Sequence, residues 1–341
     1  MSTLSRATNQ DVQAGQRVIT LGQAIREALA EEMRRDPRVF VIGEDVAEAG
    51  TPFKVLSGLV DEFGKERVID SPISEPGITG MGVGAAMTGM RPVVDIMFGD
   101  FMTLIMDQVV NQAAKIHYMS GGKLKVPLVV RTTLGATRRS AAQHSQSLHA
   151  WVSHVPGVKV VLPSTPYDAK GLLKTAIRDD NPVVFFEDKM MYQLKGHVPE
   201  SDYTIPFGVA DIKRAGTDIT IVATSSMVQV ALKAAEQLEQ IGISAEVIDP
   251  RTTFPLDKQT MIESAKKTSR AIVIDEGYER YGVTAELASV ISDGAFYYLD
   301  APVKRMGAMD VPVPFSPVLE DITVPTPDTV LALAKTLCGR V

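Results

Sequence analysis

Short apolar runs alternate along the chain with longer stretches whose apolar residues recur at helical spacing. Runs of this kind are typical of strands buried on both faces of a parallel sheet. A Thr20–Gln23 capping box marks the start of the first helix. In the first half, the pattern predicts strands at 39–42, 67–70, 91–97, 126–131, 158–162 and 183–187, and helices at 21–35, 101–118 and 166–177. This alternation predicts a doubly wound α/β domain with ligands at the carboxyl ends of its strands.

A second α/β unit follows a stretch without a clear pattern. Strands are expected at 218–224, 245–248 and 271–275, and helices at 226–240, within 255–268, at 282–293 and at 328–337. The sequence therefore predicts two three-layer α/β domains. The expected divisions are a flexible tail (1–16), a first domain (17–190), a linker (191–207) and a second domain (208–341).

Composition narrows the class of protein. The net charge is −6, which disfavours nucleic acid as a partner. No apolar run reaches the roughly 18 residues that would span a bilayer, so no membrane association is expected. The single cysteine, Cys338, excludes an internal disulfide framework. The first 16 residues lack the apolar core of a secretory signal, and we therefore expect a cytoplasmic protein.

One stretch, residues 70–86, places a carboxylate between a strand and a helix rich in small residues. Glu75 follows Ser74 and precedes Pro76 at the start of that helix. It could meet a ligand at the strand ends, or it could only favour the positive end of the helix by about 0.3–1 kcal/mol. The run Gly80–Ala85 nearly matches a dinucleotide-binding fingerprint, but it lies about ten residues beyond the strand. These glycines therefore indicate close helix packing.

A long polar loop, residues 132–147, is a second candidate site. It carries His144 between Gln143 and Ser145, and a histidine can give or take a proton near neutral pH. Glu44 and Asp45 also follow a predicted strand, and a role in binding and a plain surface position are equally open for them. The chain has no H-E-x-x-H, G-x-S-x-G or P-loop motif, so a hydrolase has little support.

Several motifs, in order and spanning about residues 18–337, resemble the beta subunits of thiamine-diphosphate-dependent 2-oxo acid dehydrogenases. This family includes the pyruvate, branched-chain and acetoin enzymes. The resemblance implies a pyrimidine-binding fold followed by a transketolase C-terminal-like domain. The motifs are Gly43-Glu-Asp-Val46, Ser71-Pro-Ile-Ser-Glu75, Asp107-Gln-Val-Val-Asn-Gln-Ala-Ala-Lys115, Ala141-Ala-Gln-His-Ser-Gln146, Ala176-Ile-Arg-Asp-Asp-Asn-Pro182 and Asp249-Pro-Arg-Thr252.

The resemblance also implies roles for individual residues. Glu75 would hydrogen-bond a ring nitrogen of the cofactor's aminopyrimidine and favour its imino tautomer. Phe101 would pack on that ring, with Ile73 and Met97 lining the pocket. His144 would assist proton transfer during reductive acylation of a lipoyl group. Residues 132–140 depart from the glycine-rich loop expected before this histidine.

Two ions belong to the family's pattern. A potassium site built largely from backbone oxygens would fall on Leu128, Ala176, Ile177, Asp179 and Asn181, although Asp179 and Asn181 also suit a plain turn before Pro182. The Gly-Asp-Gly signature that holds magnesium and the diphosphate is absent. The resemblance therefore implies that an alpha subunit holds Mg²⁺ and the other half of the cofactor, in a complex of two alpha and two beta chains.

The expected function is decarboxylation of a 2-oxo acid, of pyruvate or branched-chain type, with reductive acylation of the lipoyl group of an acyltransferase core. The alternatives are the beta subunit of an acetoin-cleaving enzyme, an NAD-binding oxidoreductase that uses Gly80–Ala85, and a non-catalytic scaffold.

Overall fold

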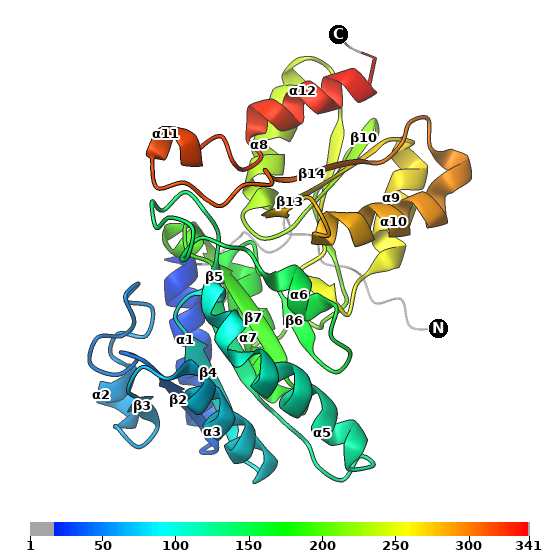
Figure 1. The fold of residues 1–341 in the computed structure, drawn as a ribbon. Coiled ribbons are helices and arrows are strands. Elements are labelled where there is room, and N and C mark those ends of the chain that lie inside the picture. The colour runs from blue at the N-terminus through cyan, green and yellow to red at the C-terminus, as the bar shows by residue number, and fades with distance from the viewer. Residues whose placement is uncertain (1–16, 340–341) are drawn as a thin grey trace.

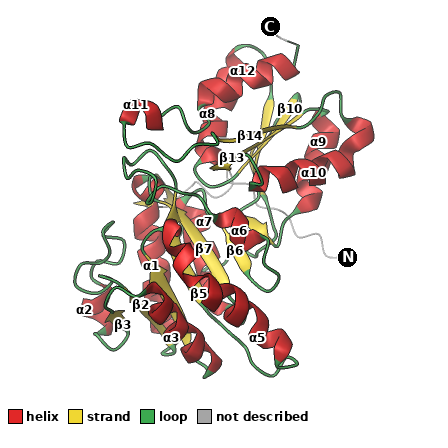
Figure 2. Cartoon of the chain, in the orientation of Figure 1, coloured by secondary structure: helices red, strands yellow, loops and turns green. Residues whose placement is uncertain are grey.

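The computed structural model describes residues 17–339, so the expected tail at 1–16 lies outside the described residues. Two α/β domains stack end to end, the first coloured blue to green and the second yellow-green to red in Figure 1. Figure 2 shows that helices cover both faces of the sheet in each domain. The predicted fold class is confirmed. Within 17–339, no helix combines the length and hydrophobicity needed to cross a bilayer.

The first domain is built on a seven-stranded sheet of order β12-β6-β7-β5-β4-β2-β3. All neighbours are parallel except β12, which pairs antiparallel with β6 although it comes from the second half of the chain. The strands are β2 (Val39–Gly43), β3 (Val68–Asp70), β4 (Arg91–Ile96), β5 (Val129–Leu134), β6 (Lys159–Val161), β7 (Val183–Asp188) and β12 (Thr252–Phe254).

Helices pack on both faces of this sheet. Consecutive residues of β7 point to opposite faces of the sheet, because Phe185 belongs to one hydrophobic cluster and Phe186 to the other. Helices α1 (Leu21–Arg35), α2 (Leu59–Phe63) and α7 (Pro166–Arg178) cover the first face, whereas α3 (Glu75–Met87), α4 (Met102–Met106) and α6 (His149–Ser153) cover the second. The capping box at Thr20 is confirmed.

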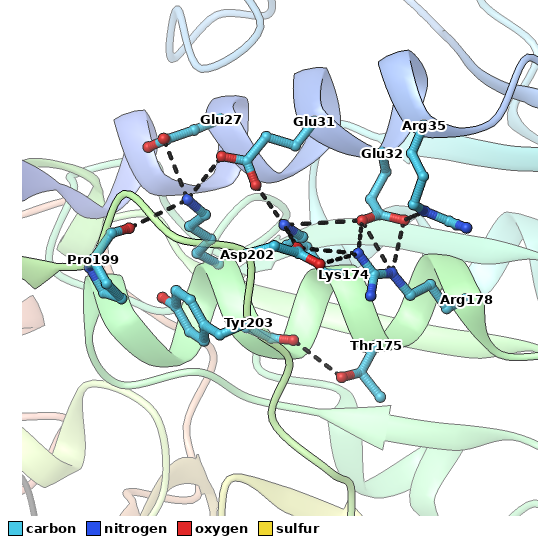
Figure 3. Close-up of polar contacts among 12 residues, drawn as sticks. Glu27, Glu31, Glu32, Arg35, Lys174, Thr175, Arg178, Pro199, Asp202 and Tyr203 are labelled. Carbon is cyan, nitrogen blue, oxygen red and sulfur yellow. Dashed lines mark hydrogen bonds and ion pairs between the residues drawn. The ribbon is translucent and has the colours of Figure 1, made fainter.

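Helices α1 and α7 are joined by buried charges as well as by apolar contacts (Figure 3). Lys170 and Lys174 lie one turn apart on α7 and are almost completely buried. The Lys170 ammonium donates to Glu31 at 2.8 Å, and Lys174 also pairs with Glu31. The fully buried carboxylate of Glu32 accepts from Arg178 at 2.6 Å. Because an unpaired charge at these positions would be costly, the pairing favours one register between the helices.

The helix expected at 101–118 is present, with a change of pitch that the sequence did not reveal. A short 3-10 turn, η1 (Gly99–Phe101), leads into α4, and a π-helical segment, η2 (Asp107–Ala113), separates α4 from α5 (Ala114–Met119). Segments of π-helix occur often near functional sites. This one packs against α3, the helix that begins with Glu75.

The second domain has a five-stranded sheet of order β14-β13-β10-β11-β9, parallel except for β9. Its strands are β9 (Asp211–Arg214), β10 (Ile219–Ala223), β11 (Ala245–Asp249), β13 (Ala271–Tyr278) and β14 (Lys304–Ala308). Helices α8 (Met227–Gln240) and α12 (Pro327–Leu337) cover one face, and α9 (Lys258–Thr268) and α10 (Val283–Ala295) the other. A short helix, α11 (Pro317–Glu320), reaches back toward the first domain.

Two local expectations differ from the structure. The segment expected as linker contains η3 (Met191–Gln193) and β8 (Lys195–Val198), and β8 pairs antiparallel with β1 (Arg17–Thr20). The strand expected at 126–131 begins later, at Val129, because Pro127 has no N–H to offer a ladder. The domain boundaries themselves remain a prediction.

Gly80, Gly82 and Gly84 lie inside α3 and not at a strand-to-helix turn. The dinucleotide-binding alternative requires glycines at such a turn, so it loses its support. A Cβ atom on Gly82 would lie 2.5 Å from Cγ2 of Val94 on β4. A Cβ on Gly84 would meet no atom within 4 Å. Gly82 therefore lets α3 approach the sheet closely, as the sequence indicated.

These two glycines provide a matched pair of substitutions. We expect Gly82→Ala to lower the free energy of unfolding by about 1–3 kcal/mol, because the added methyl group overpacks the contact with β4. Gly84→Ala should raise it by about 0.5–1 kcal/mol through the better helix propensity of alanine. Urea denaturation of the two variants tests this, and equal effects of both would contradict it.

Candidate functional site

The carboxyl ends of four adjacent strands, β3, β2, β4 and β5, carry the residues that the sequence singled out for binding or catalysis. Glu44 follows β2, and Glu75 follows β3 at the start of α3. Met97 and Phe101 follow β4, and His144 lies in the loop after β5. Because parallel strands end at one edge of the sheet, the topology brings these segments to a common edge.

Glu75 is half-buried at the first position of α3. Among residues 17–339, no group donates a hydrogen bond to its carboxylate. A second carboxyl group, Glu44, lies close enough to interact with it. Burial, together with the negative charges of Asp45 and Glu75, raises the pKa of Glu44. As the first residue of α3, Glu75 also interacts favourably with the positive end of the helix dipole. Its carboxylate oxygens still have open acceptor positions and can bind a ligand.

An aromatic cluster brings two of the predicted residues, Phe101 and His144, together. The His144 ring meets Phe98 edge-on at 4.7 Å between centroids and Phe101 at 5.5 Å. Phe98 in turn contacts Phe53 at 5.8 Å. Met97 lines a small cavity beside Phe53. The cluster therefore holds the imidazole among flat apolar surfaces.

A buried ion pair network lies beneath this cluster, and sequence reasoning missed it. Arg131 of β5 donates to Glu187 of β7 at 2.9 and 2.6 Å and also pairs with Asp95 of β4. Tyr192 donates to Glu187 at 2.8 Å. Burial raises the pKa of Asp95 to about 6, while the two carboxylates hold Arg131 charged. The only sequence signal was a charged residue inside each of three strongly apolar strands.

The loop that carries His144 contacts the second domain. Gly135 has φ of 104°, and a Cβ there would lie 3.1 Å from carboxylate oxygens of both Asp188 and Glu276. Glu276, on β13, accepts from the backbone N–H of Ala136 at 2.6 Å. Burial and the neighbouring Asp188 raise the pKa of Glu276 well above its ordinary value. The protonated form of Glu276 is therefore favoured beside the first turn of the loop.

Lys189, which the sequence did not single out, binds the backbone of the loop that carries His144. Its ammonium donates to the backbone carbonyl of His144 at 2.5 Å and lies 5.7 Å from the centre of the Phe98 ring. Lys189 is almost fully buried, and burial lowers its pKa. It thus fixes the backbone of the candidate catalytic histidine.

The surroundings of Glu75 fit an aromatic heterocycle held partly by another chain. Ile73 exposes 73% of its surface and Leu104 exposes 49%. Two buried polar atoms nearby, Oγ1 of Thr79 and Oε1 of Gln108, have no hydrogen-bond partner among the described residues. Ile73 lies two residues before Glu75, in the segment between β3 and α3, and its side chain is exposed.

The residues expected at a potassium site gather where α7 leads into β7. The carbonyl oxygens of Ile177 and Asp179 converge on the guanidinium of Arg91, at 3.0 and 2.9 Å. The carbonyl of Leu128 accepts from the N–H of Val183 at 2.9 Å, and Asn181 donates to Asp179 at 3.0 Å. The carbonyl of Ala176 accepts from the N–H of Asp179 at 3.3 Å. A potassium ion would have to compete with these donors, so the site remains a prediction.

Comparisons with known proteins agree with this architecture. Residues 17–195 match the transketolase pyrimidine-binding domain, and residues 208–330 match the transketolase C-terminal domain. A split-gene transketolase, an inactive beta4 tetramer, has the same fold with a TM-score of 0.75. It is 24% identical, and the match covers 94% of this chain and 98% of that one.

Closer relatives define the family. The chain is 51% identical to the acetoin:2,6-dichlorophenolindophenol oxidoreductase subunit beta of Bacillus subtilis, over 95% of this chain and 98% of the relative. It is 47% identical to the 2-oxoisovalerate dehydrogenase subunit beta of the same organism, over 94% and 98%. It is 49% identical to the pyruvate dehydrogenase E1 component subunit beta of Rickettsia felis, again over 94% and 98%.

The fold and these relatives define a transketolase-like, thiamine-diphosphate-dependent enzyme chain. Within that class, the chain belongs to the beta subunits of the 2-oxo acid and acetoin dehydrogenases, as its motifs indicated.

The buried network beneath the aromatic cluster gives a test of stability. We expect Arg131→Met to lower the free energy of unfolding by about 3–5 kcal/mol, because it leaves the Asp95 and Glu187 carboxylates buried without their cation. Arg34→Met is the control, since Arg34 forms an exposed pair with Glu62 at 2.5 Å and should contribute only about 0–1 kcal/mol. Chemical denaturation measures both. A loss of similar size in the two variants would contradict the assignment.

Proposed function

We propose that this chain supplies the pyrimidine-binding half of a thiamine diphosphate site in an enzyme that decarboxylates a 2-oxo acid and acylates a lipoyl group. The observation that carries the proposal is the half-buried Glu75 carboxylate, open to a ligand at the strand-end edge where Phe101 and His144 also lie. The relatives that are 47–51% identical along nearly the whole chain support it.

Each residue of the site has a distinct task in this proposal. When bound, thiamine diphosphate supplies the nucleophilic carbon and the electron sink of the reaction. Glu75 shares a proton with a ring nitrogen of the pyrimidine, a role that suits a half-buried carboxyl group with open acceptor atoms. Phe101, Met97 and Ile73 pack against the heterocycle and exclude water. His144 exchanges a proton with the lipoyl sulfur during acyl transfer.

A partner completes the site. The chain lacks the Gly-Asp-Gly motif, and two large apolar side chains, Ile73 in the segment before Glu75 and Leu104 on α4, are exposed. We therefore assign Mg²⁺ and the diphosphate to an alpha subunit, in an assembly of two alpha and two beta chains. The second domain would contribute to docking of the lipoyl-bearing acyltransferase core. The cytoplasm remains the expected location.

Acetoin cleavage is the second candidate, because a relative with that activity in its name is 51% identical to this chain. The complex reconstituted with its alpha partner should be assayed with pyruvate, branched-chain 2-oxo acids and acetoin under identical conditions. Preference for a 2-oxo acid, measured as the highest kcat/KM, supports the proposal. Preference for acetoin would replace it with the second candidate.

Glu75 provides the decisive substitution. We expect Glu75→Ala to lower kcat of the reconstituted complex by about 100-fold or more, because the proton shared with the cofactor is lost, while the complex still assembles. Glu66→Gln is the control, since Glu66 is exposed and outside the site. Steady-state kinetics and analytical ultracentrifugation measure activity and assembly. Near-normal turnover in the Glu75 variant would refute the proposal and would leave a non-catalytic scaffold as the remaining reading.

A further inference from the structure

The loop between β5 and α6 adopts a conformation that its own sequence disfavours. Thr137, Arg139 and Ala141 have φ values of 68°, 61° and 58°. For residues with a Cβ atom this left-handed region costs about 1–2 kcal/mol each. A glycine-rich loop would avoid that cost. Contacts outside the loop must therefore hold it in place.

Arg139 makes those contacts, with the second domain. Its backbone N–H donates to Glu320 at 3.1 Å and its guanidinium donates to the same carboxylate at 2.7 Å. Both terminal nitrogens also reach Asp321, at 2.7 and 3.1 Å, and one reaches the carbonyl of Pro317 at 3.3 Å. All three acceptors lie in or next to α11.

The buried member of this cluster is Glu320. Its side chain is fully buried, although it lies on a short surface helix. The hydrogen bonds to its carboxylate among residues 17–339 come from Arg139. A buried carboxylate needs such donors, so the two residues depend on each other.

The segment that contains Arg139 is connected by a hydrogen bond to the candidate catalytic histidine. The N–H of His144 approaches the carbonyl of Ala141 at 3.4 Å, two residues beyond Arg139. Lys189 holds the carbonyl of His144 at 2.5 Å, and the negative charge of Glu320 acts on Lys189 as well. The loop is thus fixed at Arg139 and again at His144.

We propose that Arg139 and Glu320 are positioning residues, which latch the loop to α11 and so hold the His144 ring at the reactive edge. This inference rests on the proposed role of His144 in acyl transfer to the lipoyl group. Neither residue lines the cavity next to Met97. Loss of the latch should therefore affect the step that needs His144 and spare the steps that do not.

The test uses the complex reconstituted with its alpha partner. Substrate oxidation is measured twice, once with 2,6-dichlorophenolindophenol as artificial acceptor and once with a lipoyl domain. We expect Arg139→Ala to lower the lipoyl-coupled kcat by about 10–100-fold, because a displacement of about 1 Å is enough for such a loss, while the dye-coupled rate stays near that of the unaltered complex. Arg139→Lys should lose less, since an ammonium keeps the charge but not the forked geometry.

A second variant and a structural readout keep the test independent of misfolding. Glu320→Gln removes the charge from the same contact with almost the same shape, and should show the same selective loss. In both variants the amide hydrogens of residues 136–144 should exchange faster with solvent. Arg270→Ala is the control, because Arg270 forms its pair with Asp300 (2.9 Å) at the opposite end of β13 from the loop.

The outcomes separate this inference from the function on which it rests. His144→Asn should lower the lipoyl-coupled rate. If it leaves the lipoyl-coupled rate unchanged, the role of His144 fails and the latch fails with it. If His144→Asn lowers that rate but the Arg139 and Glu320 variants do not, only the latch is refuted. Equal loss of both rates in Arg139→Ala would also refute it, because it would indicate general damage.

Discussion

A single guanidinium in the middle of the first sheet ties together the strands that form the site. Arg131 on β5 pairs with Asp95 on β4 and with Glu187 on β7. Desolvation of three charges is costly, and it is offset only when all three stay in register. The segments that follow these strands carry the aromatic cluster, the His144 loop and Lys189. The geometry of the site therefore depends on a pairing that lies beneath it.

Buried charges also join the two domains. His149, at the start of α6, contacts Asp275 of β13 at 3.0 Å. Although burial opposes it, the imidazole and the hydrogen bonds around Asp275 hold the pKa of that carboxyl below its ordinary value. Arg251 reaches Asp168 on α7 at 2.7 Å, and β12 adds an antiparallel strand to the first sheet. The second domain is thus part of the scaffold that fixes the loop after β5.

The edge of the sheet near Glu75 differs from this tightly paired interior. Its carboxylate accepts no hydrogen bond from residues 17–339, and the large apolar side chains of Ile73 and Leu104 are exposed. Together with the absence of Gly-Asp-Gly, this agrees with a site that a second chain completes. This chain has an interior held together by buried ion pairs, and an edge near Glu75 where apolar side chains are exposed.

The sequence by itself determined most of the elements and proposed the candidate site residues. Helical and strand periodicity placed α1, α8 and most strands within a few residues. Local context singled out Glu75 and His144, and the family resemblance added Phe101. These signals are short-range. The partners of Arg131, Ala136 and Arg139 lie 56, 140 and 181 residues away along the chain, so no local pattern could reveal them. Only the tertiary structure decided which charges are buried together, that β8 and β12 would join strands distant in sequence, and that α11 would hold the His144 loop, because each of these depends on long-range packing.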